Sequence, residues 1–329
     1  MSMKSKYKRA IVTGGAGFIG SHICERLLQE GLEVISIDNY FAGKKRNVAH
    51  LHQYAGFSEV NCDVTDYDAL KEHFEGVDIV YHQAASKKTI CLNDPRKDLR
   101  INAEGTFNLL ELSRDFGVKK FVHASTGSVY GEARYFPQDE DHPLNPTSYY
   151  GVSKLAGEKY VRAFVDLYGL DATILRYFHV YGPRQEYNDN GGVVPIFGRR
   201  VLDGQRPIIY GDGTQQRSFT FVRDLAEINI LVAMTEGTAG EAYNCASGIK
   251  VTVAELADKI RTHYGREDLE PVFKEWTPGD IKVFEVDNTK LKNIGFQFNT
   301  DFDAGLEATL DWLSQIHDEI KAEFNYAEQ

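Results

Sequence analysis

The stretch Thr13-Gly14-Gly15-Ala16-Gly17-Phe18-Ile19-Gly20 follows the apolar run Arg9–Val12 and precedes an amphipathic stretch that ends at Gly31. This order predicts a strand, a glycine turn and a helix over Ser21–Glu30. Gly14 can adopt turn dihedrals that a Cβ forbids, Gly17 lets a diphosphate approach the backbone, and Gly20 lets the helix pack closely on the strand. The unpaired amides of the helix start then face the diphosphate. We therefore expect a bound dinucleotide, contacted by Gly14, Gly17, Phe18, Ile19 and Gly20.

A second apolar strand, Glu33–Ile37, ends at Asp38, 18 residues after Gly20. A carboxylate at that place accepts both hydroxyls of an adenosine ribose and repels a 2′-phosphate, which favours NAD over NADP. The run Lys44-Lys45-Arg46 argues the other way, because it could hold a 2′-phosphate. A solvated helix start is the simpler interpretation of that run.

Apolar strands and amphipathic helices alternate as far as Arg176. The expected strands are Phe57–Asn61, Val77–Tyr81, Lys120–Ala124 and Ala172–Arg176, and the expected helices are Asp66–Phe74, Lys97–Phe116 and Tyr150–Tyr168. Thr65 with Asp68 resembles a capping box for the first of these helices. Alternation of this kind predicts an α/β fold, a Rossmann doubly wound parallel sheet whose ligands sit at the carboxyl ends of the strands.

Beyond Arg176 the alternation gives way to loop-rich sequence and to turn signals such as Gly211-Asp212-Gly213. We expect an NAD-binding domain over 1–180, joined by returning segments near 222–247, and a smaller C-terminal α/β lobe over 181–329 that binds the substrate. The returning segments are a helix, Val222–Met234, and a strand, Ala242–Asn244. Leucines at near-helical spacing predict a last helix over Ala304–Phe324.

Composition limits the class of protein. The 329 residues are 42% hydrophobic, enough for a large core, and carry a formal net charge of −11, which argues against nucleic-acid or anionic-membrane partners. No run approaches the roughly 18 consecutive apolar residues of a membrane span. Four scattered cysteines without CxxC spacing indicate reduced core thiols, no disulfide framework and no metal site. We expect a soluble, cytoplasmic protein.

A possible catalytic group lies on the helix that begins near Tyr150. Tyr150 and Lys154 are four residues apart, so their side chains leave the same helical face. An adjacent ammonium favours the phenolate and lowers a phenol pKa toward the range of a general base. Thr126 closes the preceding strand, where its hydroxyl could share a substrate proton with Tyr150. An exposed Tyr and Lys on an amphipathic helix would be the simpler interpretation of the spacing alone.

With these motifs the sequence resembles the extended short-chain dehydrogenases/reductases, and among them the NAD-dependent nucleotide-sugar epimerase/dehydratase family, nearest the UDP-sugar 4-epimerases. The matching segments span almost the whole chain and are Thr13–Gly20, Asp38-Asn39, Asp63-Val64, His82–Ala85, Asn102–Thr106, Ser125–Gly131, Tyr150–Glu158, Arg176–Arg184 and Gly211–Asp224.

The resemblance implies a role for particular residues. The cofactor would be contacted by Asp38, Asn39, Asp63, Val64, Ala84, Lys87, Asn102, Tyr150, Lys154 and Tyr177, with Asp63 and Val64 flanking the adenine and Tyr177 lining the nicotinamide site. The nucleotide sugar would be contacted by Thr126, His179, Arg184, Val193, Arg217 and Asp280, with Arg217 against the diphosphate. Thr126, Tyr150 and Lys154 would be catalytic. The resemblance further implies a homodimer formed by the helices near Lys97–Phe116 and Tyr150–Tyr168.

The same resemblance implies that Tyr150 takes a proton from a sugar hydroxyl while NAD takes the hydride from the same carbon. A 4-epimerase then returns the hydride to the other face and needs no further acid or base. The dehydratase branch carries Asp-Glu directly after the catalytic threonine, and the decarboxylating branch carries Glu at the second of these places. Gly127 and Ser128 stand there in this chain. Epimerisation at C4 is therefore expected, with dehydratase, decarboxylase, net dehydrogenase and a non-catalytic NAD-binding protein as alternatives, and Glu132 as an acid that could substitute.

Two positions, His179 and Thr277, depart from the pattern of the 4-epimerases, and a third, Phe284, bears on the choice of sugar. His179 stands where an asparagine usually contacts the nucleotide sugar, and an imidazole could donate a similar hydrogen bond, titrate, or be satisfied by backbone. Thr277 replaces an arginine that often makes a second diphosphate contact, so that either another cation, such as Arg184 or Arg199, compensates or the nucleotide sugar is held differently. Phe284 falls near the place where side-chain bulk selects among N-acetylated sugars.

Overall fold

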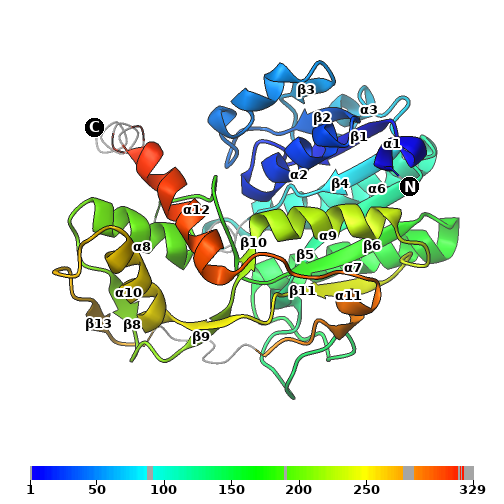
Figure 1. Cartoon of the computed structure of the whole chain (residues 1–329). Helices are drawn as coiled ribbons and strands as arrows, with labels where there is room; N and C mark the ends of the chain where they lie inside the picture. Colours follow the sequence, from blue (N-terminus) through cyan, green and yellow to red (C-terminus); the bar gives the residue numbers. More distant parts are fainter. Residues whose placement is uncertain are drawn as a thin grey trace. The chain divides into compact units, whose positions relative to one another are not determined.

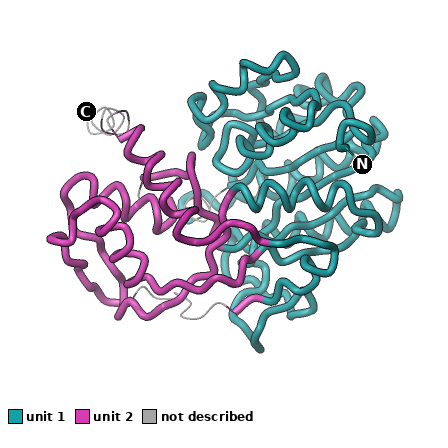
Figure 2. Tube along the Cα trace, viewed as in Figure 1, with its two compact units in different colours: residues 1–178, 223–245, 287–297 teal, residues 179–222, 246–286, 298–329 magenta. Residues whose placement is uncertain are grey.

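The computed structural model of the chain describes residues 2–86, 92–188, 191–276, 285–317, 319 and 321 (Figure 1). It divides into two compact units, drawn in different colours in Figure 2. The first comprises residues 1–178, 223–245 and 287–297, and the second comprises 179–222, 246–286 and 298–329. The segment 287–297 was not assigned to the first unit from the sequence. It joins that unit because the Asn244 side-chain amide donates to the backbone oxygens of Gln138 and Asp287, at 3.2 and 3.1 Å.

The first unit is built on one seven-stranded sheet in which every pairing is parallel. Its strand order is β11 (Ala242–Cys245), β6 (Ala172–Tyr177), β5 (Lys120–Thr126), β4 (Ile79–His82), β1 (Arg9–Thr13), β2 (Glu33–Ile37) and β3 (Phe57–Val60). The expected α/β doubly wound fold is confirmed. Because all strands run the same way, their carboxyl ends meet at one edge, and the predicted site residues of this unit are gathered there.

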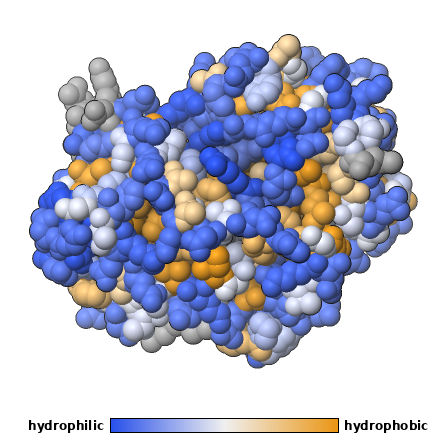
Figure 3. Space-filling model, viewed as in Figure 1, coloured by the Kyte–Doolittle hydropathy of each residue, from blue (hydrophilic) through white to orange (hydrophobic). Residues whose placement is uncertain are grey.

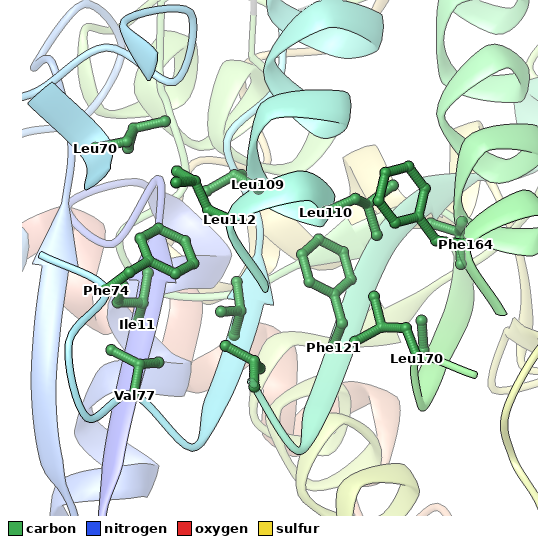
Figure 4. Close-up of a cluster of buried hydrophobic side chains, with 14 of the residues drawn as sticks. Ile11, Leu70, Phe74, Val77, Leu109, Leu110, Leu112, Phe121, Phe164 and Leu170 are labelled. Carbon is green, nitrogen blue, oxygen red and sulfur yellow. The ribbon is translucent and has the colours of Figure 1, made fainter. Parts of the chain in front are cut away.

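Helices cover both faces of this sheet (Figure 1). One face carries α2 (Phe18–Gln29) and α9 (Val222–Met234), and the other carries α3 (Tyr67–Lys71), α6 (Gly105–Asp115) and α7 (Tyr149–Tyr168). Leu109, Phe121 and Phe164 belong to the buried cluster under α3, α6 and α7, which Figure 4 shows. The short elements of this unit are α1 (Met3–Lys6), α5 (Pro95–Leu99), α11 (Thr289–Asn293) and 3-10 turns at Lys45–Asn47, Ala49–Gln53 and Gly127–Val129.

The helix expected over Lys97–Phe116 is confirmed: α5 and α6 are continuous through a π-helical turn, Arg100–Glu104, which was not predicted. Within this turn the Asn102 side chain bonds outside its own helix. Another local prediction was wrong. The expected capping box of Thr65 and Asp68 does not form. Instead the Asp66 side chain caps α3 by accepting from Ala69 N at 3.1 Å, because Thr65 uses its hydroxyl on Asp63 at 2.8 Å.

The second unit packs three helices, α8 (Val193–Leu202), α10 (Val253–His263) and α12 (Phe302–Gln315), around a core that includes Phe219, Leu256 and Leu310. Short strand pairs flank them: β7 (Val180–Tyr181) with β10 (Thr220–Phe221), β9 (Gln216–Ser218) with β12 (Lys250–Thr252), and β8 (Ile208–Tyr210) with β13 (Val272–Lys274). The last helix was predicted to extend to Phe324, which lies outside the described residues.

Within the part of the chain that the structure describes, no helix is both long enough and apolar enough to cross a membrane. Cys24, Cys62 and Cys245 are buried free thiols, as predicted, and Cys91 lies outside the described residues.

Candidate functional site

The glycine turn that links β1 to α2 is so tightly packed that it leaves no room for a Cβ atom at Gly14 or Gly20. Gly14 has a φ of +66°, and its amide donates to Ile37 O at 2.7 Å, which ties the turn to β2. A Cβ on Gly20 would lie 2.8 Å from the carbonyl carbon of Gly14 and closer still to its oxygen. Gly17 is the N-cap residue of α2 and, as a glycine, has no side chain with which to cap that helix. The turn thus presents uncapped amides and a backbone without Cβ atoms, which fits the diphosphate of a dinucleotide.

Asp38 follows β2 and is held by the loop around it. Its two carboxylate oxygens accept from Ala16 N at 3.0 Å and from Tyr40 N at 2.8 Å. Burial raises the pKa of Asp38, against the opposing effect of these amides. The loop is itself tied to the glycine turn, since Lys44 N and the Asn47 side-chain amide both donate to Ala16 O at 2.9 Å. The carboxylate and the glycine turn therefore form one fixed surface.

Asp63 and Val64 lie just beyond the end of β3. Asn39 donates to the Asp63 carboxylate at 2.7 Å, which brings together two residues predicted to contact the cofactor. Although burial opposes it, hydrogen bonds from the amide and hydroxyl of Thr65 lower the pKa of Asp63. Val64 is fixed through its carbonyl oxygen, which accepts from the Asn108 side chain at 3.1 Å.

The end of β4 packs against the glycine turn through a buried hydrogen-bond chain. Thr13 and Thr106 contact the two ring nitrogens of His82 at 2.8 and 2.9 Å, and Ala84 N donates to the Thr13 hydroxyl at 3.3 Å. Ala84 accordingly lies beside Gly14, where a Cβ would be 2.8 Å from its amide nitrogen. Lys87, the next predicted cofactor contact along this segment, lies outside the described residues.

Both the oxygen and the nitrogen of the Asn102 side-chain amide form hydrogen bonds within the protein. Its amide oxygen accepts from Ser86 N at 2.9 Å, and its amide nitrogen donates to Ser153 Oγ and to Asp98 at 3.0 Å each. The residue therefore joins the segment after β4 to α7. Through these hydrogen bonds Asn102 can serve the cofactor site indirectly, by positioning the segment after β4 and helix α7.

Tyr150 and Lys154 sit in the first turns of α7, which begins where Ser148 caps it by accepting from Gly151 N at 3.1 Å. Tyr150 is half-buried, whereas the Lys154 side chain is 2% exposed. Burial lowers the pKa of Lys154 to about 8, opposed by the carboxylates of Glu158 and Asp98. The lysine is thus still charged at neutral pH, and burial strengthens its effect on a neighbouring phenol.

Thr126 is the last residue of β5 and is half-buried at the carboxyl edge of the sheet. Its hydroxyl accepts from Ser128 N at 3.2 Å and contacts Ser128 Oγ at 3.3 Å, which caps the 3-10 turn Gly127–Val129. Sequence and topology thus bring a hydroxyl, a phenol and an ammonium to neighbouring elements of one unit, since α7 packs on β5.

A buried ion pair beneath this group was missed from the sequence. Arg176 and Glu158 are each 1% exposed and join through two hydrogen bonds, at 3.0 and 2.8 Å. Ser125, the neighbour of Thr126, donates to the same carboxylate at 2.6 Å. The one available signal was an acid four residues after Lys154, on the same face of a helix.

Tyr177 is a second tyrosine at this edge of the sheet. Its hydroxyl is within 3.1 Å of Gln83 Oε1 and accepts from the Asn229 side chain at 3.0 Å. Burial raises its pKa, so that it stays protonated at neutral pH. It can therefore shape the site and donate a hydrogen bond, but it does not supply a base.

Among the predicted substrate contacts in the second unit, His179 directly precedes β7. His179 has a φ of 36° and a ring centroid 6.3 Å from that of Phe219. Burial, with the charge of Arg217 adding to it, lowers the pKa of His179 to about 3, so the imidazole is neutral at neutral pH. The uncharged ring can offer a hydrogen bond but does not act there as a charged acid.

Arg217 lies on β9 and is 9% exposed, with one guanidinium nitrogen donating to Gln216 O at 2.9 Å. Arg184 has a φ of 69°, and Val193 is the first residue of α8. Asp280, Thr277 and Phe284 lie outside the described residues. The unit therefore brings together a buried cation and a neutral imidazole, the kind of pair that suits an anionic ligand.

A family model described as the NAD dependent epimerase/dehydratase family matches residues 10–246. Among curated relatives, a putative UDP-glucose 4-epimerase from Methanocaldococcus jannaschii is 38% identical over 92% of this chain and 97% of its own length. A UDP-N-acetyl-alpha-D-glucosaminuronate decarboxylase from Bacillus cytotoxicus is 34% identical over 95% of this chain and 99% of its own.

The solved structures that resemble this chain likewise include enzymes with different reactions. The UDP-glucose 4-epimerase of Thermotoga maritima, solved with UDP-glucose, has a TM-score of 0.87 at 35% identity and covers 93% of this chain and 99% of its own. The dTDP-glucose 4,6-dehydratase of Streptomyces venezuelae, solved with NAD, has a TM-score of 0.88 at 31% identity, covering 94% and 98%.

Proposed function

Because the chain belongs to the NAD dependent epimerase/dehydratase family, and is thus an NAD-dependent enzyme, we propose that it is a nucleotide-sugar 4-epimerase acting on a UDP-sugar. The relatives named as 4-epimerases favour this reaction. Other relatives are named as a decarboxylase and a dehydratase, so the main alternative is that the 4-keto sugar undergoes decarboxylation or dehydration. The decision between them rests on the residues beside Thr126.

In this proposal NAD is held by the first unit. The amides after Gly17 take the diphosphate, the Asp38 carboxylate takes the adenosine ribose, and Asp63 with Val64 flanks the adenine. Bound there, NAD supplies a hydride acceptor that can return the hydride to the sugar. We propose that Asp38, held in its loop, selects NAD over NADP, because a buried carboxylate repels the 2′-phosphate of NADP. The lysines at 44 and 45 do not set this preference.

Tyr150 is the general base, and it removes the proton of the sugar C4 hydroxyl. Lys154 holds its charge at neutral pH and favours the phenolate, while the Thr126 hydroxyl bonds the same substrate oxygen. When the ketone is reduced on its other face, Tyr150 returns the proton. These three side chains are sufficient for inversion at C4.

The observation that carries the proposal is the absence of an acid at residues 127 and 128. An elimination or a decarboxylation needs a further acid or base beside the ketone, but Gly127 and Ser128 provide none. Tyr130 and Tyr177 do not fill that role, since burial raises the pKa of both. Glu132, the acid that could substitute, is exposed. We therefore propose Tyr150 as the general base.

For the substrate, we propose that Arg217 contacts the diphosphate and that neutral His179 donates a hydrogen bond to the nucleotide sugar. Guanidinium suits bidentate phosphate contacts, and a cation of this kind offsets the acidic character of the chain. Arg184 and Val193 would complete this group, together with Asp280.

We further propose that the enzyme is a homodimer formed through α6 and α7. An apolar stripe follows α7 at helical spacing: Val152, Ala156, Tyr160, Ala163 and Leu167. Of these, Leu167 is 72% exposed, Val152 54% and Tyr160 41%. On the face that Figure 3 shows, hydrophilic residues predominate over α2. An exposed apolar stripe of this kind marks an interaction surface.

The proposed reaction is tested by incubating the purified chain and NAD with a panel of UDP-, GDP-, CDP- and dTDP-sugars, and resolving the products by NMR. We expect inversion at C4 of at least one UDP-sugar without accumulation of NADH, and Tyr150→Phe should bind NAD but turn over orders of magnitude more slowly. A 4-keto-6-deoxy product, release of CO₂ or stoichiometric NADH would contradict the epimerase.

A further inference from the structure

Tyr40 adopts a backbone conformation that its side chain disfavours. Its φ is 56°, in the left-handed region, where the Cβ of any residue other than glycine crowds the following carbonyl oxygen. In an unconstrained loop a bulky residue occupies this region roughly tenfold less than ordinary backbone conformations. Such a conformation persists only where the surrounding structure holds it, and it often belongs to a functional site.

The backbone of Tyr40 is joined directly to the carboxylate that is proposed to bind the adenosine ribose. Tyr40 N donates to Asp38 Oδ1 at 2.8 Å, and Ala16 N donates to the other oxygen at 3.0 Å. Because the Asp38 side chain is buried, these two amides set the orientation of its carboxylate. A change in the backbone conformation of residue 40 therefore changes the direction in which the carboxylate points.

The Tyr40 side chain is held at its far end by strand β3. Its hydroxyl donates to Glu59, which lies opposite Ser36 of β2 in the parallel register. The other carboxylate oxygen of Glu59 is 2.5 Å from His52 Nε2, so the acceptor is itself fixed. Burial, together with the hydrogen bond to Glu59, raises the pKa of Tyr40. The phenol thus stays protonated at neutral pH and serves as the donor.

We propose that Glu59 is a positioning residue for the cofactor, because it holds the Tyr40 hydroxyl and so keeps residue 40 in the left-handed conformation that orients the Asp38 carboxylate toward the ribose. This rests on the proposed role of Asp38 and adds Tyr40 and Glu59 to the residues that determine the choice of cofactor. When Tyr40 is released, the loop relaxes to ordinary backbone, and NAD binding weakens by the fraction of chains that lose the competent arrangement. NADP gains nothing from the carboxylate, so its binding does not weaken.

The role of the backbone is tested by equilibrium dialysis of the full chain against isotopically labelled NAD, with NADP in parallel. Tyr40→Ala and Tyr40→Gly both remove the ring and its hydroxyl, but only glycine reaches a positive φ without crowding. We expect the dissociation constant for NAD to rise about tenfold in Tyr40→Ala and at most about threefold in Tyr40→Gly. The dissociation constant for NADP should stay within about twofold of the wild-type value in both variants.

The role of Glu59 is tested in the same assay. Glu59→Leu alone should weaken NAD binding about tenfold, whereas beside Tyr40→Gly it should add less than about twofold, because glycine needs no tether there. Tyr54 provides the matched control, since it is a tyrosine of the same unit on extended backbone, with a φ of −91°. Tyr54→Ala and Tyr54→Gly should bind NAD alike.

Three results would overturn the inference. They are equal NAD binding by Tyr40→Ala and Tyr40→Gly, an undiminished effect of Glu59→Leu beside Tyr40→Gly, and an equal loss of NAD and NADP binding, which would mean general damage to the site. An Asp38→Asn variant that binds NAD as tightly as the wild type would instead refute the proposed role of Asp38. No sugar is present in the assay, so its outcome does not depend on whether the chain inverts one.

Discussion

Lys154 is the residue at which stability and chemistry conflict most directly. Its ammonium is 2% exposed, and burial lowers its pKa from 10.5 to about 8, which means that folding works against its charge. The carboxylates of Glu158 and Asp98 offset only part of this cost. A buried cation that the fold alone does not favour is typical of a functional group.

We predict that Lys154→Met lowers turnover by orders of magnitude and leaves the melting temperature at pH 7 unchanged or raised by roughly 2–5 °C. Between pH 8 and 10.5 the unfolded chain binds a proton that the folded one has released, and wild-type stability therefore rises with pH in this window. The difference in melting temperature from Lys154→Met should accordingly shrink there. Lys159→Met, at an exposed position of the same helix, is the control and should change neither quantity. A marked loss of stability in Lys154→Met would contradict this account of the site.

Residue types and spacings predict candidate site residues only where one short motif carries the proposed role. Gly14, Asp38, Tyr150 and Lys154 belong to such motifs. Glu158, by contrast, has its partners on β5 and β6, 33 and 18 residues away along the chain. Pairings of that separation exist only in the folded sheet, and spacing along one helix does not reveal them.

At the scale of elements, the pair of Glu158 and Arg176 joins α7 to β6, and Ser125 joins the same carboxylate to β5. Although burial opposes it, hydrogen bonds and charge from Glu158 raise the pKa of Arg176, so the guanidinium remains charged at neutral pH. The pair thereby fixes the elements that carry Tyr150, Thr126 and Tyr177 relative to one another.

We predict that Glu158→Gln costs about 3–5 kcal/mol of stability, because it leaves a buried guanidinium without its counter-charge. Turnover should fall while KM for the sugar changes little, since Thr126 and Tyr150 lose their alignment. The joint variant Glu158→Leu with Arg176→Met should regain most of the stability. Glu104→Gln, in the exposed pair of Arg100 and Glu104, is the control. Denaturant unfolding and steady-state kinetics check both; an effect no larger than the control's would exclude the positioning role.

Helices and strands could be predicted where the spacing of the apolar residues and the length of the segment indicate the same element, as in β1, β2, β5 and α7. The π-helical turn at Arg100–Glu104 could not, because its cause is tertiary. Asn102 bonds to Ser86 and to Ser153, residues on two other segments. Similarly, Asp66 rather than Thr65 caps α3, because Thr65 bonds backward to Asp63.

At the scale of the whole molecule, the apolar stripe on α7 predicts the assembly. In a homodimer, the solution mass by light scattering should be twice the 37.1 kDa of one chain. Tyr160→Glu with Leu167→Glu should reduce it to a single chain, since two charges would enter the contact. Arg162→Glu changes the charge of an exposed polar position on the same helix and should leave the mass unchanged. A wild type that runs as one chain would exclude the dimer.

The central claim is that C4 is oxidised and reduced again within one turnover. Its most direct test uses UDP-glucose with deuterium at C4, incubated with the enzyme and NAD in ordinary water, with the products followed by NMR. We predict UDP-galactose that keeps its deuterium at C4, because the same hydride returns to the carbon it left. Deuterium found at C6, lost to solvent or accumulated as deuterated NADH would contradict the account.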